Sequence, residues 1–191
     1  MKKFCLFVMV LSIGMVSAAN AAIIQYDFTG GSGNYSSIDF TMSGVTVTAT
    51  ATYNGFSNSA NVSRDNHGLG VRNGYLDSSD IDGLFRNDYL TLTFDNAVSL
   101  LGLDFDHDTS NDEFDLYVDG VNVVYNLETT GGWEEFSFGT YVGNSFTVRA
   151  NGASDNFVLS GLRVETVPEP ALFALMGFGL LGLGVMRRRR S

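Results

Sequence analysis

Residues 87–95 read Asn-Asp-Tyr-Leu-Thr-Leu-Thr-Phe-Asp, with apolar residues at 90, 92 and 94 and threonines at 91 and 93. Successive side chains of a β-strand point to opposite faces, so this alternation predicts a strand with one face buried and the other in water. The 3.6-residue period of an amphipathic helix is almost absent from the middle of the chain. The stretch therefore predicts an all-β domain.

The same alternation recurs on both sides of this stretch. The segments are 24–28, 45–50, 101–107, 114–118, 121–127, 136–138, 146–148 and 157–164. Asp119-Gly120 separates two of them, which is the signal of a tight hairpin turn. About nine or ten short strands predict an antiparallel β-sandwich, jelly-roll-like in topology, with an up-and-down barrel as the alternative. Residues 30–37 and 54–82 have the composition of long loops.

The start of the chain has the three parts of a secretory signal peptide. Met1-Lys2-Lys3 precedes the apolar run 4–16, and small residues occupy most of positions 17–21. The small residues Ala19 and Ala21 predict cleavage after Ala21, with Ala18 as a competing site. We expect residues 1–21 to form a signal helix and the remainder of the chain to be exported.

Residues 167–191 combine three unlike signals. A stiff Pro-Glu-Pro tripeptide comes first, then an uncharged run from 171 to 186, then four arginines. As a helix, 171–186 would be roughly 24 Å long, and it would span only a thin bilayer. Arginines are retained on the cytoplasmic side, so the domain at 22–166 is predicted to be extracytoplasmic, anchored by a transmembrane helix.

These three signals in this order resemble the PEP-CTERM sorting signal of Gram-negative bacteria. The resemblance covers about an eighth of the chain and implies that an exosortase, a membrane cysteine protease, cuts near the tripeptide. It implies an inner-membrane anchor before processing, a cell-surface or extracellular location afterwards, and an association with exopolysaccharide. The residues that carry it are Pro168, Glu169, Pro170, Arg187, Arg188, Arg189 and Arg190.

A second, weaker resemblance lies inside the domain. Gly68-Leu69-Gly70-Val71, then Ile81-Asp82-Gly83, then the strand at 90–94 resemble a recurrent ectodomain of PEP-CTERM proteins whose function is largely uncharacterised.

The composition limits the partners. The single cysteine, Cys5, lies in the signal peptide, so the mature chain has no disulfide. Six of the 11 Lys and Arg residues lie in the terminal segments, which leaves five arginines against 21 carboxylates and a net charge of −16 for residues 22–169. Nucleic acid is excluded as a partner because phosphate binding requires a basic surface. Divalent cations and glycans remain open.

The densest acidic segment is 104–115, with six carboxylates in twelve positions. Calcium takes six to eight oxygen ligands and suits such a cluster. The predicted ligands are Asp104, Asp106, Asp108, Asp112 and Asp115. Thr109 at the turn position, Asp115 in place of glutamate and strand-like flanks argue against an EF-hand. The alternative is the wet face of a strand followed by a polar turn.

A second acidic segment, 77–83, precedes the strand at 90–94. In jelly-roll carbohydrate modules calcium often ties such a loop to the edge of the sandwich. By that fold analogy Asp80, Asp82 and Asp88 are further calcium ligands. The alternative is a simple turn at Asp82-Gly83.

Catalytic motifs are scarce. His67 and His107 are the only histidines, and the serine-hydrolase, zinc-protease and thiol signatures are absent, so we expect no enzyme activity. Trp133 and Tyr75 are the predicted stacking platforms for a glycan, although a core position for Trp133 is the alternative. Tyr53 and Tyr141 are further aromatics of the same kind.

Together these features predict an exported, non-catalytic cell-surface or extracellular-matrix protein that binds calcium or glycan and is associated with exopolysaccharide. The alternative is a secreted polysaccharide hydrolase, which would need two carboxylates facing each other at roughly 5 to 10 Å.

Overall fold

The computed structural model describes residues 21–167 except 57, 75–76, 85 and 108–110. Residues Ala21–Val167 form one compact unit. Its strands are β1 (Ile23–Asp27), β2 (Gly33–Tyr35), β3 (Ile38–Met42), β4 (Val45–Tyr53), β5 (Asn58–Arg64), β6 (Leu69–Arg72), β7 (Ile81–Asp82), β8 (Asp88–Asp106), β9 (Glu113–Val118), β10 (Val121–Glu128), β11 (Trp133–Glu135), β12 (Val142–Ala150) and β13 (Asn156–Thr166).

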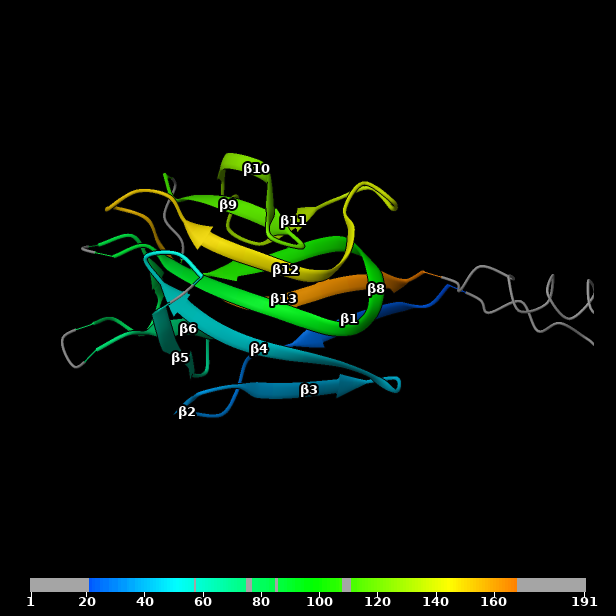
Figure 1. The fold of residues 1–191 in the computed structure, drawn as a ribbon, viewed down its shortest axis with the longest axis horizontal. Helices are drawn as coiled ribbons and strands as arrows, with labels where there is room; N and C mark the ends of the chain where they lie inside the picture. Colours follow the sequence, from blue (N-terminus) through cyan, green and yellow to red (C-terminus); the bar gives the residue numbers. More distant parts are fainter. Residues whose placement is uncertain (1–20, 57, 75–76, 85, 108–110, 168–191) are drawn as a thin grey trace, which may run out of the picture. The chain divides into compact units, whose positions relative to one another are not determined.

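Every strand pairing in this part of the chain is antiparallel, in the order β1-β13-β6-β5-β4-β8-β12-β9-β10 (Figure 1). The prediction of an antiparallel all-β domain is confirmed. The finer prediction of a jelly-roll-like sandwich stays a prediction. The expected signal helix and transmembrane helix lie outside the described residues. The described residues contain no helix that is long and apolar enough to cross a membrane.

Strand β8 has 19 residues and changes partners along its length. Residues 88–94 pair with β4, and residues 98–106 pair with β13. β12 runs along its other edge, with Leu92 opposite Phe146. In Figure 1 this strand bends around the right-hand side of the domain. The predicted strands at 87–95 and 101–107 are therefore two halves of one bent strand.

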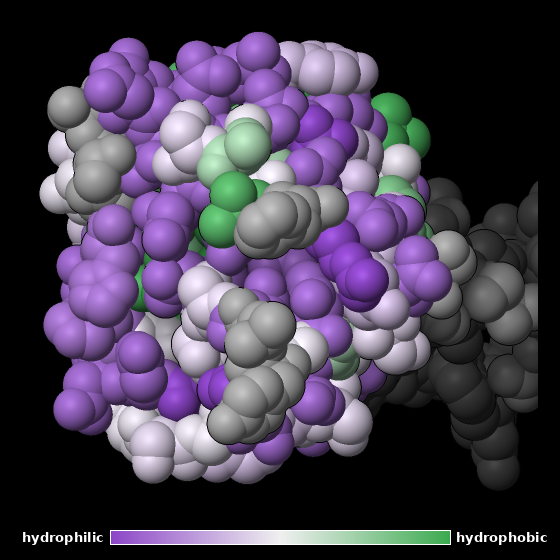
Figure 2. Space-filling model, turned by 90° about the vertical axis from the view of Figure 1, so that its left-hand side faces the viewer, coloured by the Kyte–Doolittle hydropathy of each residue, from purple (hydrophilic) through white to green (hydrophobic). Residues whose placement is uncertain are grey.

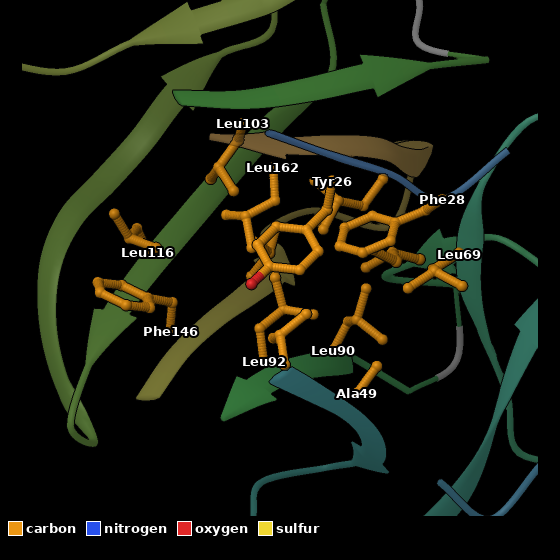
Figure 3. Close-up of a cluster of buried hydrophobic side chains, with 14 of the residues drawn as sticks. Tyr26, Phe28, Ala49, Leu69, Leu90, Leu92, Leu103, Leu116, Phe146 and Leu162 are labelled. Atoms are coloured by element: carbon orange, nitrogen blue, oxygen red, sulfur yellow. The ribbon is translucent and has the colours of Figure 1, made fainter. Parts of the chain in front are cut away.

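The core lies between the apolar faces of these strands. Figure 3 shows the ring of Tyr26 among leucines of β8 and β13, with Phe28 beside it. Both rings are at most 1% exposed, and their centroids are 6.3 Å apart. Burial raises the pKa of Tyr26 to about 12, and its hydroxyl donates to the Val45 carbonyl at 3.1 Å. Each buried large apolar side chain contributes about 1.5–3 kcal/mol.

The stretch 54–82, predicted to be a long loop, contains β5, β6 and β7. This prediction was wrong because β5 reads Asn-Ser-Ala-Asn-Val-Ser-Arg, and its polar residues hide the strand period. Backbone pairing with β4 and β6 on its two sides, together with the buried Val62, makes it a strand. The stretch 30–37 likewise contains β2, which pairs with β5.

Gly70 positions the segment that follows β6. A Cβ at this residue would lie 1.8 Å from the Ser79 carbonyl oxygen, so only glycine lets residues 79–80 approach the strand. The Val71 amide donates to the Asp80 carbonyl at 3.2 Å. The acidic segment 77–82 is thereby held against β6.

We expect Gly70→Ala to lower the free energy of unfolding by about 1–3 kcal/mol or more, because the segment 77–82 must move away from β6. Thermal unfolding of the full chain in mild detergent measures this. Gly74→Ala is the matched control, since a Cβ there meets no atom within 4 Å. Equal stability of the two variants would contradict the packing role of Gly70.

Figure 2 shows the end of the domain that lies at the left of Figure 1. Its described surface is mostly hydrophilic, and the apolar residues form small separate groups. This end therefore offers polar chemistry rather than a broad apolar docking surface.

Candidate functional site

Three carboxylates meet near the start of β8. Asp77 comes from the connection after β6, Asp82 ends β7 and Asp88 begins β8, and their ligand atoms all lie within 4.8 Å of one another. Asp82 is 5% exposed and Asp88 is fully buried. Among the described residues, no other three His, Cys, Asp or Glu side chains bring their ligand atoms this close.

Hydrogen bonds orient all three carboxylates. The Asn73 backbone amide donates to Asp77 at 2.7 Å, and the Asn73 side-chain amide donates to Asp88 Oδ1 at 3.0 Å. The Ser78 hydroxyl donates to Asp82 Oδ2 at 2.5 Å, and the Leu84 amide donates to Asp82 Oδ1 at 3.0 Å. Because each carboxylate is held in place, the group has a defined geometry.

Burial, helped by the charges of Asp77 and Asp82 and opposed by the Asn73 hydrogen bond, raises the pKa of Asp88 to about 8. Burial also raises the pKa of Asp77, against the hydrogen bond from Asn73. Without a cation, Asp88 is therefore mostly protonated near neutral pH. A bound divalent cation would favour its ionised form.

The sequence predicted Asp82 and Asp88 in one site with Asp80, and the structure instead places Asp77 beside them. Asp80 is hydrogen-bonded to Asn156 and feels the charge of His107, and burial raises its pKa. Asp77 stood in the same acidic segment, but a count of carboxylates does not show which side chains turn inward.

The predicted ligands of segment 104–115 have separate partners. Asp104 is half-buried on β8, and Asp106 is exposed and contacts His67 at 3.0 Å. Asp112 is buried and accepts from the Asn156 amide at 3.2 Å. Asp115 is buried and forms an ion pair with Arg149 at 3.0 Å. Asp108 lies outside the described residues.

The two histidines contact each other beside Asp106. The ring centroids of His67 and His107 are 3.9 Å apart, and both residues are exposed. His67 Nδ1 lies 3.0 Å from Asp106 Oδ2. This contact was not predicted, because the two histidines are far apart in the chain: His67 lies between β5 and β6, and His107 directly follows β8.

Trp133 lies on β11, partly exposed, with its ring against two glycine positions. A Cβ at Gly161 would lie 3.2 Å from the ring, and one at Gly102 would lie 3.0 Å from it. The Arg163 guanidinium is 4.3 Å from the ring centroid and also pairs with Glu135. The indole thus packs against β8 and β13 while its edge lines a cavity of about 260 Å³. Tyr75, the other predicted platform, lies outside the described residues.

Comparison with known families identifies the C-terminal signal. A family model described as the PEP-CTERM protein-sorting motif matches residues 166–190. The chain therefore carries a PEP-CTERM sorting motif, as the sequence predicted. The motif supports export through an exosortase pathway and a membrane-anchored C-terminal signal before processing. Its residues 168–190, with the tripeptide and the arginines, lie outside the described part of the chain.

Two further comparisons give no relatives. A search of curated proteins and a search of solved structures each found no match to this chain.

The raised pKa of Asp88 predicts a pH dependence of stability. An unfolded aspartate has a pKa of about 3.9, so the folded state holds an extra proton between that value and about 8. The stability that this proton contributes is complete below about pH 3.9. It declines as the pH rises and is lost once the pH passes about 8. In chelator, we expect the free energy of unfolding to fall by a few kcal/mol from pH 5 to pH 9.

Asp88→Asn should remove most of this decline, because the amide does not ionise. Asp95→Asn, at an exposed position, should leave it unchanged. Denaturant unfolding at a series of pH values measures the slopes. Parallel curves for Asp88→Asn and the wild type would rule out Asp88 as the titrating group.

Proposed function

We propose that this chain is an exported cell-surface or extracellular protein, processed by an exosortase, with a non-catalytic, jelly-roll-like β domain. In this proposal residues 1–21 are removed as a signal peptide and residues 171–186 form a temporary membrane anchor. The PEP-CTERM motif at residues 166–190 is the observation that supports the export route. Association with exopolysaccharide is the role we propose at the cell surface.

We further propose that Asp77, Asp82 and Asp88 bind calcium. The group offers oxygen ligands only, which suits calcium or magnesium rather than zinc or copper. Calcium accepts several carboxylates in flexible geometry and completes its six to eight ligands with carbonyls and water. Magnesium keeps most of its own water and demands a stricter octahedron. A group of three buried or half-buried carboxylates therefore favours calcium.

The role of calcium would be structural. The three carboxylates come from the connection after β6, from β7 and from β8, so one ion would join three segments. It would also offset the repulsion between carboxylates in a domain that carries far more acids than arginines.

Calcium should raise the melting temperature of the full chain, because an ion that binds only the folded state stabilises it by about 2.7 kcal/mol at 100 times its dissociation constant. Asp82→Asn should abolish the increase. Asp80→Asn, in the same segment but outside the group, should retain it. Thermal unfolding with chelator or millimolar calcium measures the response, and no response in the wild type would refute the calcium proposal.

Processing tests the export proposal. Replacing Pro168 and Pro170 together by alanine should block removal of the C-terminal tail, because the stiff extended tripeptide is lost. Intact-mass measurement of the protein from the native host reads this out. Ser191→Ala, outside the matched motif, should be processed normally. Normal processing of the double variant would count against exosortase recognition at the tripeptide.

A further inference from the structure

Strand β5 changes partners in its middle, and a groove opens there. Residues 58–60 pair with β4, whereas residues 62–64 pair with β2. β6 pairs with residues 61–64 along the other edge. A cavity of about 570 Å³ lies beside this change of partner, lined by β2, β4, β5 and the end of β6. Small-molecule sites commonly have volumes of about 300–1,000 Å³.

The lining of this groove differs in chemistry from the rest of the domain. It consists of hydroxyl and amide side chains, one arginine and the three small residues Ala51, Ala60 and Gly74. The polar lining residues are Asn34, Ser36, Thr50, Thr52, Ser59, Asn61, Arg72 and Asn73. No described lining residue is a carboxylate, although the chain has 21 of them. The groove is therefore a place where an anionic group meets no facing carboxylate.

Arg72 is the single charged residue in the lining, and its guanidinium has no hydrogen-bond, ion-pair or ring partner among the described residues. The other four arginines of the domain each make a hydrogen bond, an ion pair or a ring contact, for example Arg149 with Asp115 and Arg86 over Tyr53. Within the described part of the chain, the Arg72 side chain makes none of these contacts, although its charge lowers the pKa of Asp77. Thr52 Oγ1 on the groove wall is buried and has no hydrogen-bond partner.

We propose that this groove binds an acidic saccharide, with Arg72 pairing with the sugar carboxylate. A guanidinium binds a carboxylate through two parallel hydrogen bonds, and this pairing is stronger than a neutral hydrogen bond. Hydroxyl and amide side chains both donate and accept, which matches the ring hydroxyls of a sugar. The net charge of the domain opposes an anion, but salt screens this repulsion beyond about 8 Å at physiological ionic strength.

The inference rests on the proposed glycan association and specifies its site and its ligand class. It does not depend on calcium, although Asn73 connects the two regions. Asn73 lines the groove and also donates hydrogen bonds to Asp77 and Asp88.

Two sugars that differ in one group form the test. Methyl glucuronide carries a carboxylate where methyl glucoside carries a hydroxymethyl group. Saturation-transfer NMR on the full chain in mild detergent should show binding of the glucuronide about tenfold tighter than that of the glucoside. Arg72→Gln should remove this preference, and Arg86→Gln, which changes an arginine outside the groove, should preserve it.

A second variant tests the same site in case Arg72→Gln does not fold. Ser59 is exposed on the groove wall, so Ser59→Glu should fold normally and weaken glucuronide binding about tenfold by adding a carboxylate. Equal affinity for both sugars, unchanged in Arg72→Gln, would overturn the acidic-saccharide inference and leave a neutral glycan site. Binding of neither sugar would overturn it as well, while tail processing and the calcium response of the same samples test the proposed function separately.

Discussion

The double pairing of β8 is the constraint on which the rest of the domain depends. One end of this strand pairs with β4 and β12, and the other pairs with β13 and β11. Its inward residues, among them Leu92 and Leu103, contribute to one continuous core along both halves. Residues 21–167 contain no cysteine, so backbone pairing and apolar burial must hold the domain together. Loss of either half of β8 would separate the strands that carry the loops.

The second constraint is the excess of Asp and Glu over arginine. The fold stabilises buried and exposed carboxylates in different ways. Asp115 on β9 is buried and forms an ion pair with Arg149 on β12, a strand that is distant in sequence but adjacent in the sheet. Asp106 stays at the surface, where hydrogen bonds from His107 and His67 lower its pKa. Asp88 is buried without an arginine partner, and burial raises its pKa to about 8. Of these three aspartates, only Asp88 needs a bound proton or a cation to offset the burial of its charge. The calcium proposal rests on this need.

The segment after β6 links the acidic site to the groove. Gly70 lets residues 79–80 lie against β6, and Asn73 hydrogen-bonds both Asp77 and Asp88. Arg72, which lies between Gly70 and Asn73 in sequence and ends β6, lines the groove. A short stretch of chain therefore serves both sites.

The sequence by itself determined the sorting motif, the antiparallel β character and the inward faces of strands such as 90–94, because these depend on order and period within one segment. It also brought Asp82 and Asp88 together as candidate ligands. It missed β5, whose polar residues hide the strand period, and chose Asp80 where the structure has Asp77. Only the tertiary structure decided the bent course of β8, the Asp115–Arg149 pair and the groove at Arg72. A two-residue period tells which face of a strand is buried and not which strand lies beside it, and the groove and the ion pair arise from those long-range pairings.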